Sequence, residues 1–190
     1  MNLSIVSNVL LILLAVGFVA VRQMTWRPVL GARDWMLPGI IAVIGAVLSL
    51  QTLSGQVIGV MDVVALVVEL VVAFALGTAM GAMAHIRRIA RPAGYQPAAG
   101  LSDRAAAQAA AEFETRTGPW GLALWVVLIG VRVGLMFAFE QLGSHIGVAT
   151  GLILIVLAAN RAARVVVLHR RVDALRRTSA PSGSARIIVP

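Results

Sequence analysis

Residues 57–84 decide the fold, and they read VIGVMDVVALVVELVVAFALGTAMGAMA. The run is apolar almost throughout and is interrupted only by the acids Asp62 and Glu69. A helix rises 1.5 Å per residue, so about 20 apolar residues cross the roughly 30 Å hydrocarbon core of a bilayer. This stretch is therefore predicted to be a transmembrane helix.

Four more apolar runs have a similar character, although the second is short and begins at the interfacial pair Trp35 and Pro38. The first run lacks the preceding basic region and small-residue cleavage site of a signal peptide, so we expect it to be retained. The fifth helix is expected to continue into water through Leu175. We predict an all-α membrane bundle in one domain over residues 1–177, with five spans at residues 3–21, 36–50, 57–84, 120–139 and 146–159.

The composition excludes several classes of protein. Hydrophobic residues make up 59% of the chain, the mean hydropathy is +0.92, and the 13% of charged residues cluster between apolar runs, which is untypical of a water-soluble domain. The net charge of +8 lies beside these runs, where arginine sets topology and contacts anionic lipid headgroups, so nucleic-acid binding is not expected. The absence of cysteine excludes disulfides, iron–sulfur ligation and thiol chemistry by this chain.

The arginines predict the orientation. All sixteen basic residues are arginine, a bias typical of a GC-rich bacterial genome. All except Arg132 fall in segments 22–33, 87–116 and 161–186, whereas the alternate connections 51–56 and 140–145 contain none. Positive charge is retained on the cytoplasmic side. We therefore expect a multi-pass protein of a bacterial cytoplasmic membrane with its N-terminus outside and its C-terminus inside.

The connection 85–118 is predicted to be a cytoplasmic loop. Pro92, Gly94, Pro97 and Gly100 break any helix that enters it. After them, Ser102 can cap a short alanine-rich helix that we expect to run to about residue 115. The tail, residues 178–190, has the composition of a disordered segment.

The candidate site is a cluster of charges inside the spans. Asp62 and Glu69 are seven residues apart, so they share one helix face about 10 Å apart along the axis. Arg132 in the fourth span is expected between them in depth, reaching Asp62 directly and Glu69 through water. Buried ions in a membrane indicate function by default, and Glu69 and Asp62 are the candidate catalytic or proton-carrying acids. The competing interpretation is structural: an Arg132 to Asp62 pair holds two helices together.

A haem or metal site is not predicted. His85 and His169 lie at the inner ends of spans, where headgroup or loop contacts are the expected role, while His145 lies at the outer side. The sequence contains no zinc signature, nucleophile elbow, P-loop or dinucleotide fingerprint. No cofactor is therefore expected.

Glycine pairs predict close helix packing. Gly77 and Gly81 form a G-x-x-x-G pattern in the third span, and Gly147 and Gly151 form another in the fifth. We interpret them first as packing surfaces within the bundle, and second as a contact with a second copy or another membrane protein. Asn8 and Asn160 are candidates for interhelical hydrogen bonds.

Short motifs resemble a known family. They are Arg22-Gln-Met-Thr-Trp-Arg-Pro28, then Trp35-Met-Leu-Pro38 and Gly45, and later Ile129-Gly-Val-Arg132. This pattern is similar to the CcdC-like small membrane proteins and covers about a third of the chain. The resemblance implies a multi-pass protein of ill-defined function, named for genetic proximity to cytochrome c maturation genes. The alanine-rich loop departs from that family, and the lack of cysteine speaks against direct thiol redox work.

Three functions stay open from the sequence. The first is a non-enzymatic accessory or resistance factor that contains the Asp62, Glu69 and Arg132 cluster. The second is a small proton-coupled carrier, which requires a water path to Glu69. The third is a membrane enzyme that protonates a lipid or isoprenoid, which requires an apolar pocket open to lipid.

Overall fold

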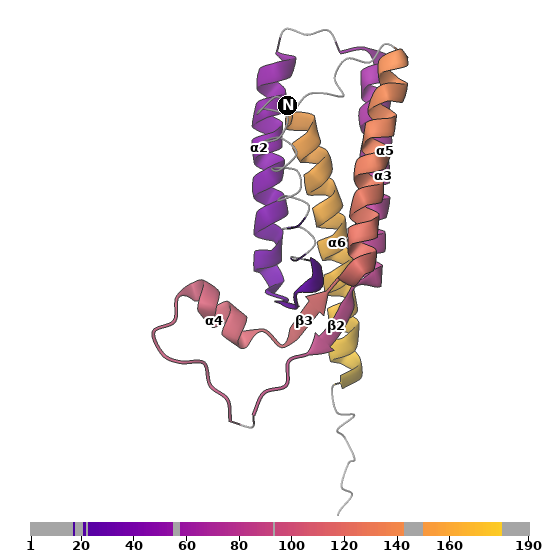
Figure 1. Ribbon diagram of the computed structural model, residues 1–190. Coiled ribbons are helices and arrows are strands. Elements are labelled where there is room, and N and C mark those ends of the chain that lie inside the picture. The colour runs from indigo at the N-terminus through magenta and orange to yellow at the C-terminus, as the bar shows by residue number, and fades with distance from the viewer. Residues whose placement is uncertain are drawn as a thin grey trace, which may run out of the picture.

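The computed structural model describes residues 17, 21, 23–54, 58–92, 94–142 and 150–179. These residues are mostly helical, and four helices are long and apolar enough to cross a membrane. They are α2 (Met36–Leu53, entered through the 3-10 turn η1, Gly31–Trp35), α3 (Val60–Met83), α5 (Gly118–Gln141) and α6 (Thr150–Ser179) (Figure 1). They match the second to fifth predicted spans, while the first, apart from Gly17 and Val21, lies outside the described residues, as do His145, Asn8 and Gly147.

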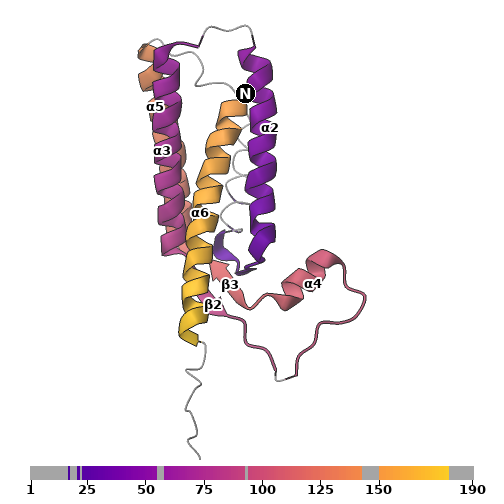
Figure 2. The ribbon, with the colours of Figure 1, turned by 180° about the vertical axis from the view of Figure 1, so that it is seen from behind.

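Helix α6 is the centre of the described bundle. It lies between α2 and α3, as Figure 2 shows from behind, and α5 packs on α3. Small residues allow this arrangement: a Cβ atom on Gly77 would lie 2.2 Å from the backbone oxygen of Asn160, and one on Gly81 would lie 2.9 Å from Val167 Cβ. The packing role predicted for Gly77 and Gly81 is thereby confirmed within this chain.

A hydrogen bond between helices fixes the same contact. Asn160 Nδ2 donates to the backbone oxygen of Ala73 at 2.8 Å, and both residues are buried. The interhelical hydrogen bond predicted for Asn160 is thus confirmed. On the other side of α6, a Cβ on Gly151 would lie 2.3 Å from the backbone nitrogen of Ser49, so α2 and α6 also meet backbone to backbone.

The outer surface of the bundle is apolar. No residue in the most apolar window of α5 is buried, and Val126 and Phe137 are 57% and 58% exposed. Similar exposed valines, isoleucines and leucines cover α2 and α3. A continuous apolar surface of this kind is incompatible with water and suits contact with lipid chains.

A small sheet lies at one end of the bundle, which we call the sheet end (Figure 1). Its strands are β1 (Arg27–Pro28), β2 (His85–Arg88) and β3 (Phe113–Arg116), ordered β1-β3-β2 with both pairings antiparallel. The all-α prediction therefore holds for the spans but not for these segments. The sheet ties together the ends of α3 and α5 and the chain that enters η1.

The alanine-rich helix begins where the sequence predicts it. Ser102 Oγ accepts the backbone N–H of Ala105 at 3.4 Å, and α4 runs over Asp103–Ala110. The prediction that it reaches residue 115 is wrong, because Phe113 and Thr115 are buried in alternation in β3. Aromatic and β-branched residues spaced by two favour a strand once a partner strand is present.

An arginine of α6 binds the carbonyl groups at the end of α3. Arg171 of α6 donates through Nη1 to the backbone oxygens of Gly81 at 2.9 Å, Ala82 at 2.6 Å and Ala84 at 2.7 Å. This guanidinium satisfies carbonyls that the end of α3 leaves without helical partners.

Helix α6 continues past Leu175, as predicted, and includes residues 178 and 179, which we assigned to the tail. Residues 180–190 lie outside the description.

Candidate functional site

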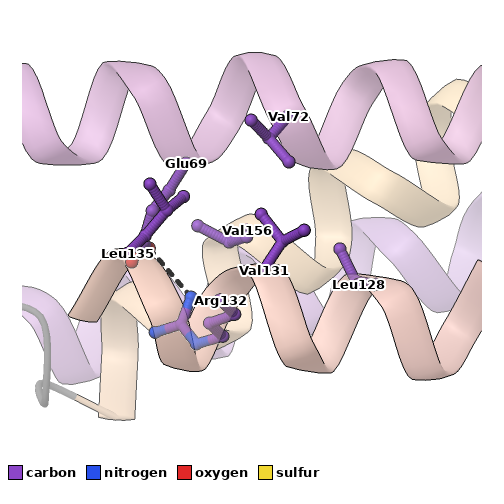
Figure 3. Close-up of a pocket in the computed structure, with 7 residues that line it drawn as sticks. All are labelled: Glu69, Val72, Leu128, Val131, Arg132, Leu135 and Val156. Carbon is purple, nitrogen blue, oxygen red and sulfur yellow. Dashed lines mark hydrogen bonds and ion pairs between the residues drawn. The ribbon is translucent and has the colours of Figure 1, made fainter. Parts of the chain in front are cut away.

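An ion pair joins two helices inside the apolar bundle. Arg132 Nη1 of α5 donates to Glu69 Oε2 of α3 at 2.8 Å (Figure 3). The Glu69 side chain is 8% exposed and that of Arg132 is 21% exposed. Each charged group therefore meets its counter-charge where little water reaches, and the contact is a short, charge-assisted hydrogen bond.

The helix ends explain why Arg132 meets Glu69. Glu69 lies nine residues after Val60, where α3 begins, and Arg132 lies nine residues before Gln141, where α5 ends. The two helices run in opposite directions, so both side chains lie about 13 Å from the end opposite the sheet. The sequence placed the span ends at residues 57 and 139, and this shift of two to three residues moved Arg132 toward Asp62. Arg132 contacts Glu69 directly, where we had expected a contact through water.

Asp62 has a different position and a different contact. It is buried in the first turn of α3, where its Oδ2 accepts the backbone N–H of Gly59 at 2.9 Å. This is the carboxylate half of a capping box, and an acid at a helix N-terminus is also favoured by the helix dipole. The structure thus uses Asp62 to begin α3, about 10 Å along the axis from Glu69.

The surroundings of the ion pair are aliphatic. A cavity of about 10 Å³ opens beside Glu69 and Arg132, and Figure 3 shows the side chains that line it, contributed by α3, α5 and α6: Val72, Leu128, Val131, Leu135 and Val156. This volume accommodates about one water molecule. Beside the ion pair there is thus room for about one water.

The histidines are placed apart from this site. His169 Nε2 lies 3.1 Å from Asp34 Oδ2, the same oxygen that accepts the backbone N–H of Leu30 at 3.1 Å. The Trp35 ring meets the His169 ring edge-on, with centroids 6.4 Å apart. These contacts attach η1 to α6, while His85 is exposed on β2. Within the described ranges, no three His, Asp or Glu side chains are grouped as a metal ion would require.

Sequence reasoning missed the charge pairs of the sheet. Glu114 accepts from Arg87 Nε at 2.5 Å, and Glu112 accepts from Arg88 and, at 3.2 Å, from Arg176 Nε. The hydrogen bond from Arg88 is the main cause that lowers the pKa of Glu112; burial opposes it, and the charge of Arg88 and the contact with Arg176 lower the pKa further. The signal was present as acids at positions 112 and 114 and arginines at positions 87 and 88, but it has meaning only once the two strands are paired.

Comparison with known protein families, with curated proteins and with solved structures finds no match to this chain. The resemblance to CcdC-like proteins stays a prediction from its short motifs. The structure places Arg27 and Pro28 of these motifs in β1, Pro38 in the first turn of α2, and Arg132 in the ion pair.

Proposed function

We propose that this chain is a five-span protein of a bacterial cytoplasmic membrane, N-terminus outside, that serves as an accessory or resistance factor rather than as an enzyme. The observation that carries the proposal is the ion pair of Glu69 and Arg132. It joins two helices at one depth beside a cavity with room for about one water. Such a contact suits a structural connection between helices better than a substrate site.

The topology is supported by charge. Every arginine except Arg132 lies in segments 22–33, 87–116 or 161–186, and those that the structure describes lie in η1, the sheet, α4, the connection that contains Arg91, or α6 from Arg161 onward. The sheet end is therefore strongly positive, and positive segments are retained in the cytoplasm. With residues 3–21 as a further span, the chain crosses five times.

Reporter fusions test this orientation directly. A tag before residue 1 and a tag in the 54–59 connection are expected outside, and tags within 94–101 and after residue 190 are expected inside. The matched comparison is between the two ends of one chain: if both terminal tags report the same side, the number of spans is even and the proposed topology is wrong.

A proton-coupled carrier is the second candidate, favoured by the contact between a cavity and the Glu69 carboxylate. It predicts that purified protein in vesicles carries protons across the membrane and that Glu69→Gln abolishes this flux. Asp62→Asn is the matched control, because Asp62 lies at the start of α3 and not at the cavity. The accessory role predicts that the parent protein and both variants give no flux above empty vesicles.

A membrane enzyme is the third alternative. The aliphatic lining suits a lipid chain, but an isoprenoid requires several hundred Å³ rather than space for a single water. The accessory role requires no movement of the helices, whereas an isoprenoid site would require them to separate. The CcdC-like resemblance supports it through its association with cytochrome c maturation, where the lack of cysteine leaves this chain an assisting rather than a redox part.

A further inference from the structure

One face of the small sheet collects positive charge. Residues that face each other across paired strands point to the same side of a sheet. The register pairs His85 with Arg116 and Arg87 with Glu114, so these four side chains share one face. Glu114 is the only carboxylate of that set, and it is already hydrogen-bonded to Arg87.

Trp26 lies under two of these guanidinium groups. The Cζ atom of Arg87 is 4.0 Å from the centroid of the Trp26 ring, and the Cζ atom of Arg116 is 5.0 Å from the same centroid. Both distances are within the range of cation–π attraction. The ring orients two like charges near each other, which is unfavourable unless an anion or a carboxylate offsets their repulsion.

Arg116 is incompletely satisfied. Its Nε atom is buried and has no hydrogen-bond partner, and in the described part of the chain no carboxylate forms an ion pair with it. Arg87 remains accessible, with 56% of its side chain exposed. We call the surface formed by Trp26, Arg87 and Arg116 the headgroup face. The guanidinium N–H groups on this face that have no carboxylate partner suit a phosphate.

The position of this face selects the source of the phosphate. Strand β2 follows α3 with only Ala84 between them, and β3 is separated from α5 only by Thr117. The headgroup face therefore lies where two apolar helices end, and Trp120 in the first turn of α5 is 64% exposed. Tryptophan and arginine at this level of a membrane protein contact the headgroup layer.

We propose that the headgroup face binds the phosphate of an anionic phospholipid in the inner leaflet, through the guanidinium groups of Arg87 and Arg116. The choice of leaflet rests on the proposed topology, whereas the choice of ligand rests on the residues of the face. An anionic lipid adds negative charge to that of Glu114, which pairs with Arg87, and its acyl chains extend along the apolar surfaces of α3 and α5.

Tryptophan quenching can measure this binding. In the full chain, replacing the other three tryptophans by phenylalanine (Trp35, Trp120 and Trp125) leaves Trp26 as the single reporter. The protein is placed in nanodiscs of phosphatidylcholine that contain brominated phosphatidylglycerol or, in parallel, brominated phosphatidylcholine. We expect stronger quenching by the anionic lipid, and a preference that falls about fivefold for each arginine removed from the face.

The decisive variant is Arg87→Gln with Arg116→Gln, and its control is Arg104→Gln with Arg177→Gln. The control removes the same charge from two exposed positions away from the headgroup face. The charge-retaining pair Arg87→Lys with Arg116→Lys is measured beside them and is expected to keep most of the preference, which separates a lost site from a lost fold. The proposal is overturned if the parent shows no preference, or if the control pair loses as much as the decisive pair.

Two further outcomes are informative. If inorganic phosphate abolishes the preference while sodium chloride of equal ionic strength does not, the face recognises soluble anions and the lipid proposal is wrong. Nanodiscs offer the lipid in both leaflets, so the preference does not depend on orientation. A failure of the tagging experiment would therefore overturn the leaflet and leave the binding result intact.

Discussion

The same two residue types, arginine and glutamate, pair in two very different parts of this molecule. In the apolar bundle, Arg132 meets Glu69, whose side chain is 8% exposed. At the sheet end, Arg88 meets Glu112, with side chains 58% and 37% exposed. Water can replace either partner of the exposed pair, but it cannot easily replace a partner of the buried one.

The difference teaches what each pair contributes. An exposed pair typically adds about 0 to 1 kcal/mol, because attraction in water is weak and ordering two long side chains opposes it. A buried pair adds little compared with a well-packed apolar pair, yet removing one partner alone costs about 3 to 5 kcal/mol. The pair of Glu69 and Arg132 thus specifies which helix faces meet, whereas the exposed pairs of the sheet contribute little to stability.

Breaking the buried pair is expected to have the largest effect. Arg132→Gln leaves the Glu69 carboxylate without its guanidinium and should destabilise the protein by about 3 to 5 kcal/mol. The readout is the thermal unfolding of the detergent-purified full chain, followed by circular dichroism. Adding Glu69→Gln to Arg132→Gln removes the orphaned charge, so the double variant should recover a large part of that loss.

The matched control is Arg88→Gln, which breaks an exposed pair of the same chemistry and should change stability by no more than about 1 kcal/mol. Equal losses for Arg132→Gln and Arg88→Gln would contradict the distinction between the two regions. A double variant no more stable than Arg132→Gln alone would show that Glu69 and Arg132 are not coupled.

The glycine contacts give an intermediate effect. A Cβ on Gly77 would lie 2.2 Å from Asn160 O, so Gly77→Ala must push α3 away from α6 and should cost about 1 to 3 kcal/mol. Gly130→Ala in α5 is the control, because nothing lies within 4 Å of its Cβ position and alanine favours a helix. Both variants are compared by the same unfolding measurement. An unchanged melting temperature for Gly77→Ala would refute the close approach.

The spans could be predicted from the sequence because lipid imposes one requirement on all of them, a long apolar run. The second to fifth are found as helices, and the first, apart from Gly17 and Val21, lies outside the described residues. The role of Gly77 was also predictable, since small residues four apart have few other uses inside a span. These inferences need only local information.

The partner of Arg132 was not predictable in the same way. It depends on where α3 and α5 end, and apolar residues continue past both ends, so hydropathy alone leaves an error of two or three residues. That error is enough to make Asp62 rather than Glu69 the expected partner of Arg132. The strands were missed for a related reason: β1 has two residues and β2 and β3 have four, and their pairing joins segments far apart in the chain.

Acid should produce the smallest effect, and it should be confined to the sheet end. The Arg88 hydrogen bond, with Arg176, holds the pKa of Glu112 below its usual value in the folded protein. A group whose folded pKa is lowered stabilises the protein above its unfolded pKa, about 4.3 for glutamate, and this contribution disappears as pH falls through the lower folded pKa. Mild acid should therefore loosen the contact of β3 with the end of α6 before the bundle unfolds. Hydrogen exchange of the β3 amides measures this step between about pH 5 and 3. In the parent protein, the exchange rate of these amides, corrected for the intrinsic effect of pH, should rise in acid. In the Glu112→Gln variant it should not. If parent and variant respond equally, another carboxylate controls the sheet, and Glu114, beside Arg87, is the next to replace.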